Sequence, residues 1–316
     1  MSIGERRPGV AGGGDDAARL DAALPDVDWS VAPTGAVFTR FAAPSGELAA
    51  VSLGDPADPR VVLIPGVTGS KEDFSLLAPI LVAGGYFVQS FDLAGQYESA
   101  EAGPGHGGHY TYGLLVADVI AFLRSGAPAH VLGYSFAGIL AELALVQHPE
   151  LFRSLTLLTT PPEPGQSFRS VRLIGWLSWF LTGRQGAGLM IWGIVTNKNK
   201  VPPSRLAFVR ERFRLTRRSS VDDIVRLMRR VPDVRDAVRE AAPPVLVATG
   251  DHDLWPTHLH AANAAALGAT LAVYTTGHSP CETAPHQLAR DMLALFHRAE
   301  PAEGGQGAEG AADEAG

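Results

Sequence analysis

Short apolar runs bounded by turn residues alternate along this chain with longer amphipathic stretches. The runs have the length of buried strands, and the stretches repeat apolar residues three and four positions apart, as helices on a sheet do. The expected strands are residues 36–42, 47–54, 60–66, 86–95, 129–135, 155–160, 244–254 and 270–278. The expected helices are residues 73–85, 111–126, 136–149, 258–268 and 285–299. This alternation predicts an α/β fold with a mostly parallel central sheet that helices cover on both faces.

Residues 162–240 interrupt the alternation. Their first half is rich in tryptophan and their second half is helical in pattern and rich in arginine. We expect a helical cap here, inserted into a core formed by residues 26–161 and 241–298. Trp176 and Trp179 would pack this cap onto the core, and they are also candidates for lining an apolar substrate pocket. The arginines are expected to lie on a solvated helix face.

Both ends of the chain have few large apolar residues. Residues 1–25 are rich in Gly, Ala and Asp, and residues 299–316 are acidic and rich in Gly. Such segments cannot bury enough apolar surface to offset the entropy of ordering, so both are expected to be disordered tails.

The composition argues against several classes of protein. The formal net charge is −7, which argues against nucleic-acid binding. The single cysteine, Cys281, excludes a disulfide framework within the chain, so a reducing cytoplasm is the expected location. Arg172, Arg184 and glycines interrupt the longest apolar region, residues 171–195, so no membrane-spanning helix is expected. Nothing in the sequence sets the oligomeric state.

The hexapeptide Gly-Tyr-Ser-Phe-Ala-Gly at residues 133–138 places Ser135 between an expected strand and an expected helix. Small residues flank the serine where the two backbones approach closely and a strained conformation must be accommodated. Such a turn exposes the hydroxyl and puts the N–H of Phe136 at a helix N-terminus, where it can meet a developing negative charge. Serine is also a favoured helix cap, but the strand-turn-helix context favours a nucleophile.

A serine nucleophile needs a base, and the base needs an orienting carboxylate. His278 follows the last expected strand, and Asp253 follows the strand before it. Loops at strand ends are where an α/β fold presents such side chains. Asp251 is an alternative acid that better suits a loop or capping role, and Glu163 is a more remote alternative.

Other groups that bind metals or react as nucleophiles are scattered. The histidines of two loops lack the carboxylate and the third-ligand spacing of a metal site, so neither a metal nor a cofactor is expected. Cys281 is expected to be a small buried residue. The histidines are His106, His109, His252, His258 and His260.

The chain resembles the α/β-hydrolase family over roughly residues 36–298. The resemblance rests on five motifs whose joint order is specific. They are "LIPGVTGS" at 63–70 for the oxyanion loop, "SFDLAGQYES" at 90–99 for the Asp-x-x-Gly loop, "GYSFAG" at 133–138 for the nucleophile elbow, "GDHDLWP" at 250–256 for the acid loop and "GHSPCETAP" at 277–285 for the histidine loop.

The resemblance implies a role for each motif residue. Ser135 would be the nucleophile, His278 the general base and acid, and Asp253 the orienting acid. The N–H groups of Phe136 and Val67 would form the oxyanion hole, with Thr68 as a substitute donor for Val67.

Three positions depart from the family pattern. Pro65 stands where the family usually has His, which alters support for the oxyanion loop. Gln96-Tyr97 replace the usual middle of the Asp-x-x-Gly loop. Ala137 replaces the second glycine of the elbow, one small residue for another.

The expected activity is hydrolysis of a small-molecule carboxylic ester with an apolar acyl or alcohol part, through an acyl-enzyme on Ser135. A serine at this position disfavours the epoxide hydrolases and haloalkane dehalogenases of the family, which use aspartate. Tyr134 joins Trp176 and Trp179 as a candidate substrate-binding residue. A thioesterase, a carbon–carbon bond hydrolase and a cofactor-free perhydrolase stay open as alternatives. A slow-turnover ligand receptor or scaffold on the same fold is the alternative of another class.

Overall fold

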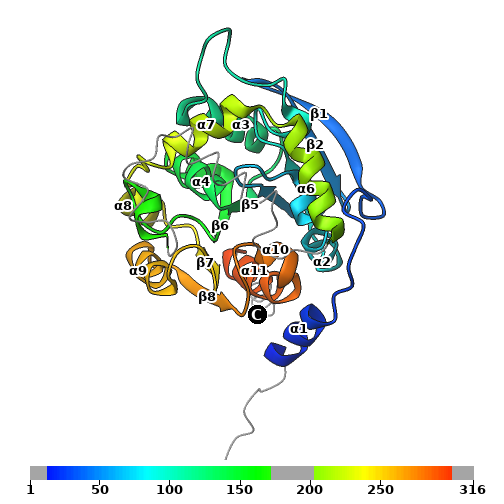
Figure 1. Ribbon diagram of the computed structural model, residues 1–316. Coiled ribbons are helices and arrows are strands. Elements are labelled where there is room, and N and C mark those ends of the chain that lie inside the picture. The colour runs from blue at the N-terminus through cyan, green and yellow to red at the C-terminus, as the bar shows by residue number, and fades with distance from the viewer. Residues whose placement is uncertain (1–12, 172–202, 301–316) are drawn as a thin grey trace, which may run out of the picture.

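The computed structural model describes residues 13–171 and 203–300. Within them, eight strands form one sheet in the order β1-β2-β4-β3-β5-β6-β7-β8 (Figure 1). Strand β2 is antiparallel to β1 and β4, and all other neighbouring strands are parallel, which confirms the predicted sheet. The strands are β1 (Val37–Ala43), β2 (Gly46–Leu53), β3 (Arg60–Ile64), β4 (Phe87–Phe91), β5 (Ala129–Tyr134), β6 (Phe152–Leu158), β7 (Val245–Gly250) and β8 (Thr270–Tyr274).

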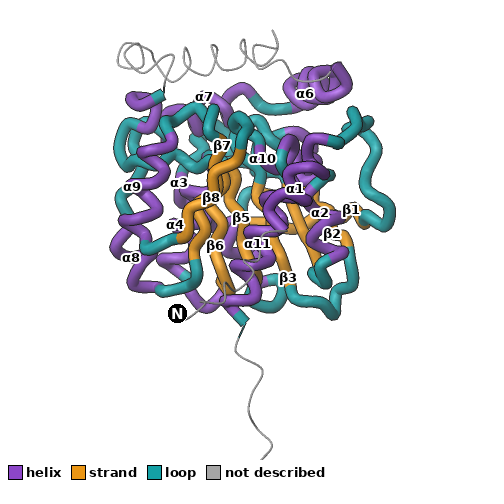
Figure 2. The backbone as a smooth tube through the Cα atoms, turned by 90° about the horizontal axis from the view of Figure 1, so that it is seen from below, coloured by secondary structure: helices purple, strands orange, loops and turns teal. Residues whose placement is uncertain are grey.

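The central strands are buried on both faces because helices cover the sheet from both sides (Figure 2). In β3, Val62 and Ile64 belong to one apolar cluster, whereas Val61 and Leu63 belong to the other. This alternation follows from the two-residue period of a strand. The first face carries α3 (Tyr112–Arg124), α4 (Phe136–Gln147), α8 (Arg235–Ala241) and α9 (Thr257–Leu267), and the second carries α2 (Leu77–Ala83), the short α10 (Pro280–Thr283) and α11 (Pro285–Ala299).

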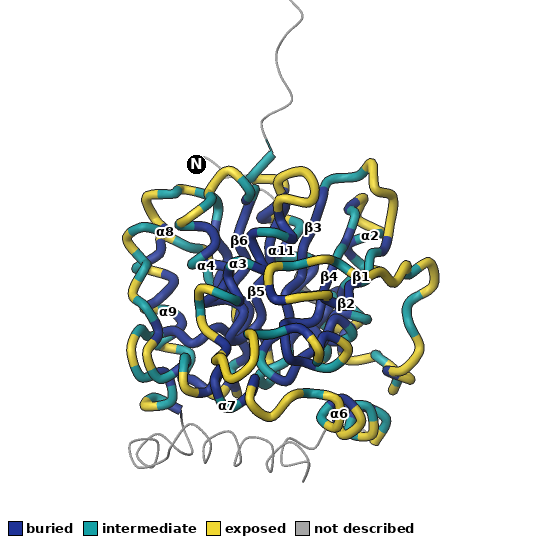
Figure 3. Tube along the Cα trace, turned by 90° about the horizontal axis from the view of Figure 1, so that it is seen from above, coloured by how far each residue is buried: buried dark blue, intermediate teal, exposed yellow. Residues whose placement is uncertain are grey.

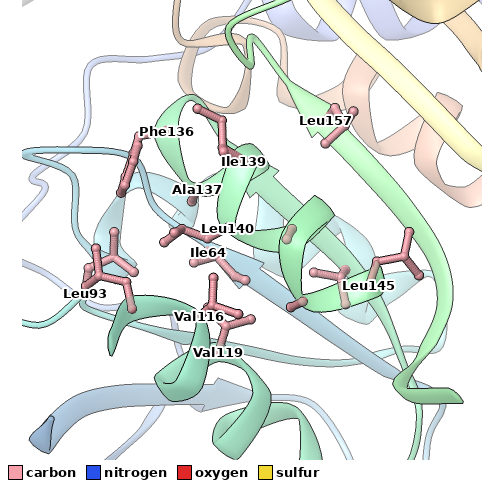
Figure 4. Close-up of a cluster of buried hydrophobic side chains, with 14 of the residues drawn as sticks. Ile64, Leu93, Val116, Val119, Phe136, Ala137, Ile139, Leu140, Leu145 and Leu157 are labelled. Carbon is pink, nitrogen blue, oxygen red and sulfur yellow. The ribbon is translucent and has the colours of Figure 1, made fainter. Parts of the chain in front are cut away.

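Helix α4 is apolar on nearly all sides because it is buried between the sheet and α3. Its Phe136, Ile139 and Leu140 lie in the same cluster as Val116 and Val119 of α3 (Figure 4). A helix held this tightly fixes the position of the turn that precedes it.

The N-terminal segment differs from the predicted tail over residues 1–25. Residues Gly13–Ala22 form helix α1, which packs against α11. The Asp21 carboxylate accepts hydrogen bonds from the backbone N–H groups of His286, at 2.8 Å, and Gln287, at 3.1 Å. A carboxylate at the first turn of α11 is stabilised by free N–H groups and the helix dipole, and this long-range contact orders the segment. Residues 1–12 and 301–316 lie outside the described residues.

The connection between β6 and β7, residues 159–244, carries the short 3-10 helix η4 (Ser167–Ser170), α6 (Pro203–Leu215), α7 (Arg218–Leu227) and α8. Helices α6 and α7 lie beyond the ends of the strands, whereas α8 packs on α4 and α9 (Figures 2 and 3). Residues 172–202, with Trp176 and Trp179, lie outside the described part of the chain, so their predicted role in the substrate pocket stays a prediction.

The expectation that the arginines of this connection are solvated is wrong for two residues of α6. Arg205 and Arg212 are 4% and 5% exposed. Nη2 of Arg205 donates to Oδ1 of Asp73 at 2.7 Å, and Nη1 of Arg212 donates to the same oxygen at 2.5 Å. Arg205 also binds the carboxylate of Glu282. These ion pairs hold α6 on the core. A helix with a polar pattern can bury arginine where the facing surface supplies carboxylates.

In the described ranges, no helix is long and apolar enough to cross a membrane.

Candidate active site

Ser135 lies between the last residue of β5 and the first residue of α4, in a backbone conformation that non-glycine residues rarely adopt. Its φ is 53° and its ψ is −121°. Its N–H donates to the carbonyl of Leu158 on β6 at 2.8 Å, and its carbonyl accepts from Gly138 at 3.0 Å. The sheet and the buried helix therefore hold a strained turn in place, as at a nucleophile elbow.

The small residues of the turn have different spatial requirements. A Cβ on Gly133 would lie 2.6 Å from the carbonyl oxygen of Ala137, and a Cβ on Gly138 would overlap Thr160. Ala137 itself is fully buried in the apolar core. The close approach of strand and helix thus demands glycine at 133 and 138, whereas position 137 has room for a methyl group.

Three side chains from distant parts of the sequence meet at this turn. The Oγ of Ser135 lies 3.1 Å from Nε2 of His278, and the Nδ1 of His278 lies 2.5 Å from Oδ1 of Asp253. Ser135 follows β5, Asp253 follows β7 and His278 follows β8, so the parallel sheet brings them to one edge. The structure thus brings together the three residues proposed as the catalytic set.

Electrostatics fixes which ring nitrogens carry protons. Burial raises the pKa of Asp253, but His278 and the buried His260 outweigh burial and hold that pKa below its usual range. An ionised carboxylate only accepts hydrogen bonds, so Nδ1 of His278 carries the proton. In the neutral ring, Nε2 is then free to accept the hydroxyl proton of Ser135.

His260, which was expected only as one of several scattered histidines, contacts the acid of this site. Its Nε2 lies 2.8 Å from Oδ2 of Asp253, and its side chain is 1% exposed. The carboxylate is therefore held at both oxygens. His260 lies on α9 seven residues after the acid, and that spacing across a loop and a helix start gives no recognisable motif.

Two aromatic rings flank the imidazole of His278. The ring of Trp255 lies 5.8 Å away and the ring of Tyr134 lies 5.6 Å away. The Trp255 indole N–H donates to the carbonyl of Ser167 at 2.6 Å, and the hydroxyl of Tyr134 pairs with that of Ser279 at 2.8 Å. Tyr134 is 7% exposed. It packs beside the histidine loop, and its predicted substrate contact stays a prediction.

Residues 66–69, in the predicted oxyanion loop, form a tight turn beside the serine, and we refer to it as the oxyanion turn. The N–H of Gly69 donates to the carbonyl of Gly66 at 3.0 Å, and Thr68 has a φ of 62°, as the third residue of a type II turn requires. A Cβ on Gly66 would lie 3.7 Å from Oγ of Ser135, so this backbone borders the nucleophile. Phe136, the first residue of α4, has an N–H that the helix cannot use.

Thr68 is unsuited to the role of substitute oxyanion donor. Its N–H donates to Oε1 of Gln96 at 2.6 Å, and its side chain is buried. Val67 and Phe136 therefore remain the candidate donors.

The alternative acids and ligands lie elsewhere. Asp251 pairs with His252 at 2.5 Å and accepts from the N–H of Thr276, and Glu163 binds the hydroxyl of Ser170. Cys281 is fully buried, as predicted. Among the residues that the structure describes, no three His, Cys, Asp or Glu side chains gather as metal ligands would.

A small apolar cluster lies over the turn. Val221 and Val225 of α7 are buried against Val67 of the oxyanion turn and Phe168 of η4. Val67, which lies in the turn beside Ser135, is therefore packed against apolar side chains of α7 and η4.

Sequence comparisons identify a family and partial relatives. Residues 61–291 match the model of the alpha/beta hydrolase family. Human serine hydrolase-like protein is 29% identical over 123 residues, which cover 39% of this chain and 60% of that protein. The same number of residues of human serine hydrolase-like protein 2 align at 29% identity and cover 38% of its length. The matched region spans less than two thirds of either relative.

Solved structures share the fold. The chain superposes on a carboxylesterase from the thaumarchaeon Nitrososphaera gargenis with a TM-score of 0.67 and 18% identity, over 83% of this chain and 98% of that one. It superposes on the thioesterase domain from the curacin biosynthetic pathway with a TM-score of 0.62 and 17% identity, over 82% and 99%. At these identities the likeness establishes the fold alone.

Proposed function

The chain belongs to the alpha/beta hydrolase family, and on that premise we propose that it is a serine hydrolase that cleaves carboxylic esters through an acyl-enzyme. The observation that carries the proposal is the continuous chain of hydrogen bonds from Ser135 through His278 to the ionised Asp253. A serine hydroxyl is a weak nucleophile unless a base of this kind removes its proton.

In the first half of the reaction, Oγ of Ser135 attacks the ester carbonyl while its proton passes to Nε2 of His278. Asp253 stabilises the imidazolium that forms. The N–H groups of Val67 and Phe136 donate to the oxyanion of the tetrahedral intermediate. The intermediate collapses, the alcohol takes the proton from His278 and leaves, and the acyl group stays on Ser135.

In the second half, water attacks the acyl carbonyl and gives a proton to His278. The second tetrahedral intermediate collapses, His278 returns the proton to Oγ of Ser135, and the carboxylic acid is released. Every proton is moved by one imidazole, and no bound metal or cofactor takes part in this scheme.

The apolar cluster over the turn supports a substrate with an apolar acyl or alcohol part. Val67 and Phe168, the partly buried members of this cluster, would contact that part next to the reacting carbon. We take residues 162–240 as a cap that completes the pocket. A thioester would be cleaved by the same steps, with a thiol as leaving group, and a carbon–carbon bond hydrolase or perhydrolase would need further residues around the substrate.

The test is hydrolysis of p-nitrophenyl esters and acyl thioesters of graded chain length. We expect turnover of the oxygen esters, with higher kcat/KM for medium or long acyl chains than for acetyl. Ser135→Ala should lower kcat on the order of 10⁶-fold, and Asp253→Asn about 10⁴-fold. Asp251→Asn is the matched control and should stay near wild type.

The other outcomes each select a different function. Stronger turnover of thioesters would make the protein a thioesterase. Binding of apolar ligands by folded protein without turnover of either series would favour the receptor or scaffold function. Strict preference for acetyl esters would contradict the apolar pocket.

A further inference from the structure

The buried side chain of Gln96 joins the oxyanion turn to a helix of the β6–β7 connection. Its Oε1 accepts the N–H of Thr68 at 2.6 Å, and its Nε2 donates to Oγ of Ser220 at 2.9 Å. Ser220 in turn donates to the carbonyl of Ala94 at 3.1 Å. Gln96 and Ser220 are fully buried, where a hydrogen bond is stronger and an unpaired amide is costly.

The loop that carries Gln96 is itself fastened to the start of α7. The N–H of Arg217 donates to the carbonyl of Gly95 at 2.8 Å, and the N–H of Tyr97 donates to Oγ1 of Thr216 at 3.0 Å. Gly95 lies so close to Ser220 that a Cβ on it would come 2.6 Å from the serine Cβ. The loop and the first turn of α7 therefore form one packed unit.

Planar peptide units explain why the Gln96 contact reaches the oxyanion donor. The carbonyl of Gly66 and the N–H of Val67 belong to one planar trans peptide unit, so the hydrogen bond from Gly69 to that carbonyl sets the direction of the Val67 N–H. The next peptide unit contains the Thr68 N–H, which Gln96 holds. The two hydrogen bonds together fix the turn, and either one alone leaves a peptide unit free to rotate.

Two residues next to the Thr68 amide, Pro65 and Val67, have no side chain that could orient the turn through a hydrogen bond. Pro65 precedes the turn without a backbone N–H and without a polar side chain. Val67 contacts α7 only through apolar packing against Val221 and Val225, which resists displacement but does not orient a peptide plane. Gln96 supplies the directional contact.

We infer that Gln96 is a positioning residue for the oxyanion hole and that it couples the geometry of the hole to the position of α7. The inference rests on the proposed function, because it assigns the Val67 N–H to the oxyanion. Displacement of α7 pulls on Gln96 through Ser220, and the oxyanion turn is correctly formed only when α7 is in place. The rate of catalysis therefore depends on the position of α7.

The first experiment measures the turn without any substrate. Hydrogen exchange of the full chain is followed by mass spectrometry in the peptide that contains Val67 and Thr68. Gln96→Met keeps the side-chain length but removes both hydrogen bonds, and it should abolish protection of the Thr68 amide. Ser220→Ala keeps the Thr68 contact but frees the far end of Gln96, and it should lower that protection partially.

The second experiment measures kinetics on the best ester substrate. Gln96→Met should lower kcat about 10- to 100-fold, below the loss from removing an oxyanion donor outright, while KM changes less than about 3-fold because ground-state contacts are retained. The affinity of a trifluoromethyl ketone, whose adduct carries an oxyanion, should fall by the same factor as kcat/KM. Ser220→Ala should show the same pattern at about 3- to 10-fold.

Gln89→Met is the matched control. Gln89 lies on β4 and accepts from Nε of Arg60 at 2.5 Å, away from the oxyanion turn. It should change neither the exchange of the Thr68 peptide nor kcat. Unchanged exchange in Gln96→Met, or increased exchange with kcat at the wild-type level, would overturn the inference. If wild type does not turn over esters, or if Ser135→Ala keeps full activity, the proposed function is overturned. The hydrogen-exchange result still tests the Gln96 contact in that case.

Discussion

His260 and Asp253 are joined by a buried hydrogen bond in which Nε2 of the histidine lies 2.8 Å from Oδ2 of the carboxylate. The other oxygen of Asp253 holds His278 at 2.5 Å. The acid is thus clamped between a histidine that faces the nucleophile and a histidine that lies in the core. This clamp gives the carboxylate one orientation and keeps it ionised.

Removing the His260 contact should lower both kcat and the stability of the fold. His260→Leu leaves Oδ2 buried without a donor and lets the carboxylate rotate, so we expect kcat to fall about 10-fold and stability to fall by about 1–3 kcal/mol. His260→Gln retains a donor at similar reach and should recover most of kcat. Steady-state kinetics on an ester and urea unfolding check both effects, and equal losses of kcat in the two variants would argue against the clamp.

Two adjacent small residues of the elbow should differ in how strongly a substitution destabilises the fold. Gly138→Ala forces a methyl group into Thr160, and we expect a loss of several kcal/mol or failure to fold. Ala137→Gly adds flexibility to the first turn of α4 and removes one buried methyl group, so it should cost about 1–2 kcal/mol while ester turnover persists. Thermal unfolding measures the loss of stability in both variants. Losses of comparable size would contradict the difference assigned to the two positions.

The buried arginine of α6 should matter more to stability than an exposed arginine on the same helix. Arg205 lies 2.7 Å from Asp73 and 3.0 Å from Glu282, and these side chains are at most 10% exposed. Arg205→Ala leaves buried carboxylates short of a partner and should cost about 3–5 kcal/mol. Arg214 pairs with Glu211 at the surface, so Arg214→Ala should cost at most about 1 kcal/mol. Denaturant unfolding measures the loss of stability in each variant, and equal losses would mean that the buried ion pairs do not anchor α6.

Glu142 on α4 predicts a pH dependence of stability. Burial raises its pKa to about 8, and Asp233 adds to the rise against the opposing charge of Arg235. Between the ordinary value of 4.5 and about 8, the native state keeps a proton that the unfolded chain has lost. Stability should therefore fall as pH rises through this window and level off above it.

The variant Glu142→Gln removes this penalty and keeps the shape of the side chain. We expect it to match wild type near pH 4.5 and to exceed it by a few kcal/mol, on the order of the linkage free energy, above pH 8. Thermal unfolding at three pH values measures the gap. A gap of the same size at every pH would mean that Glu142 does not titrate with the raised pKa.

The sheet and the helices that cover it were predictable because their signals are local. The apolar run of β5 and the mostly apolar α4 indicate burial on both sides, and parallel strands that run in the same direction end at the same edge of the sheet. That geometry brings Ser135, Asp253 and His278 to one edge of the sheet, which is why the order of the motifs was enough to predict that they lie together.

The contacts that escaped prediction depend on partners far apart in the sequence. Asp21 orders α1 only because α11 presents free N–H groups 265 residues later. Arg205 is buried only because Asp73 and Glu282 face α6. Gln96 was visible as a departure from the family pattern, but its role follows only from its position between Thr68 and Ser220.

Covalent labelling of Ser135 tests the central claim most directly. The full chain is treated with a fluorophosphonate, and the labelled peptide is identified by mass spectrometry. We predict one adduct, on Oγ of Ser135, which is absent in Ser135→Ala and forms much more slowly in His278→Ala because the hydroxyl has lost its base. Folded wild-type protein that takes no label, or an adduct on another residue, would contradict the assignment of Ser135 as an activated nucleophile.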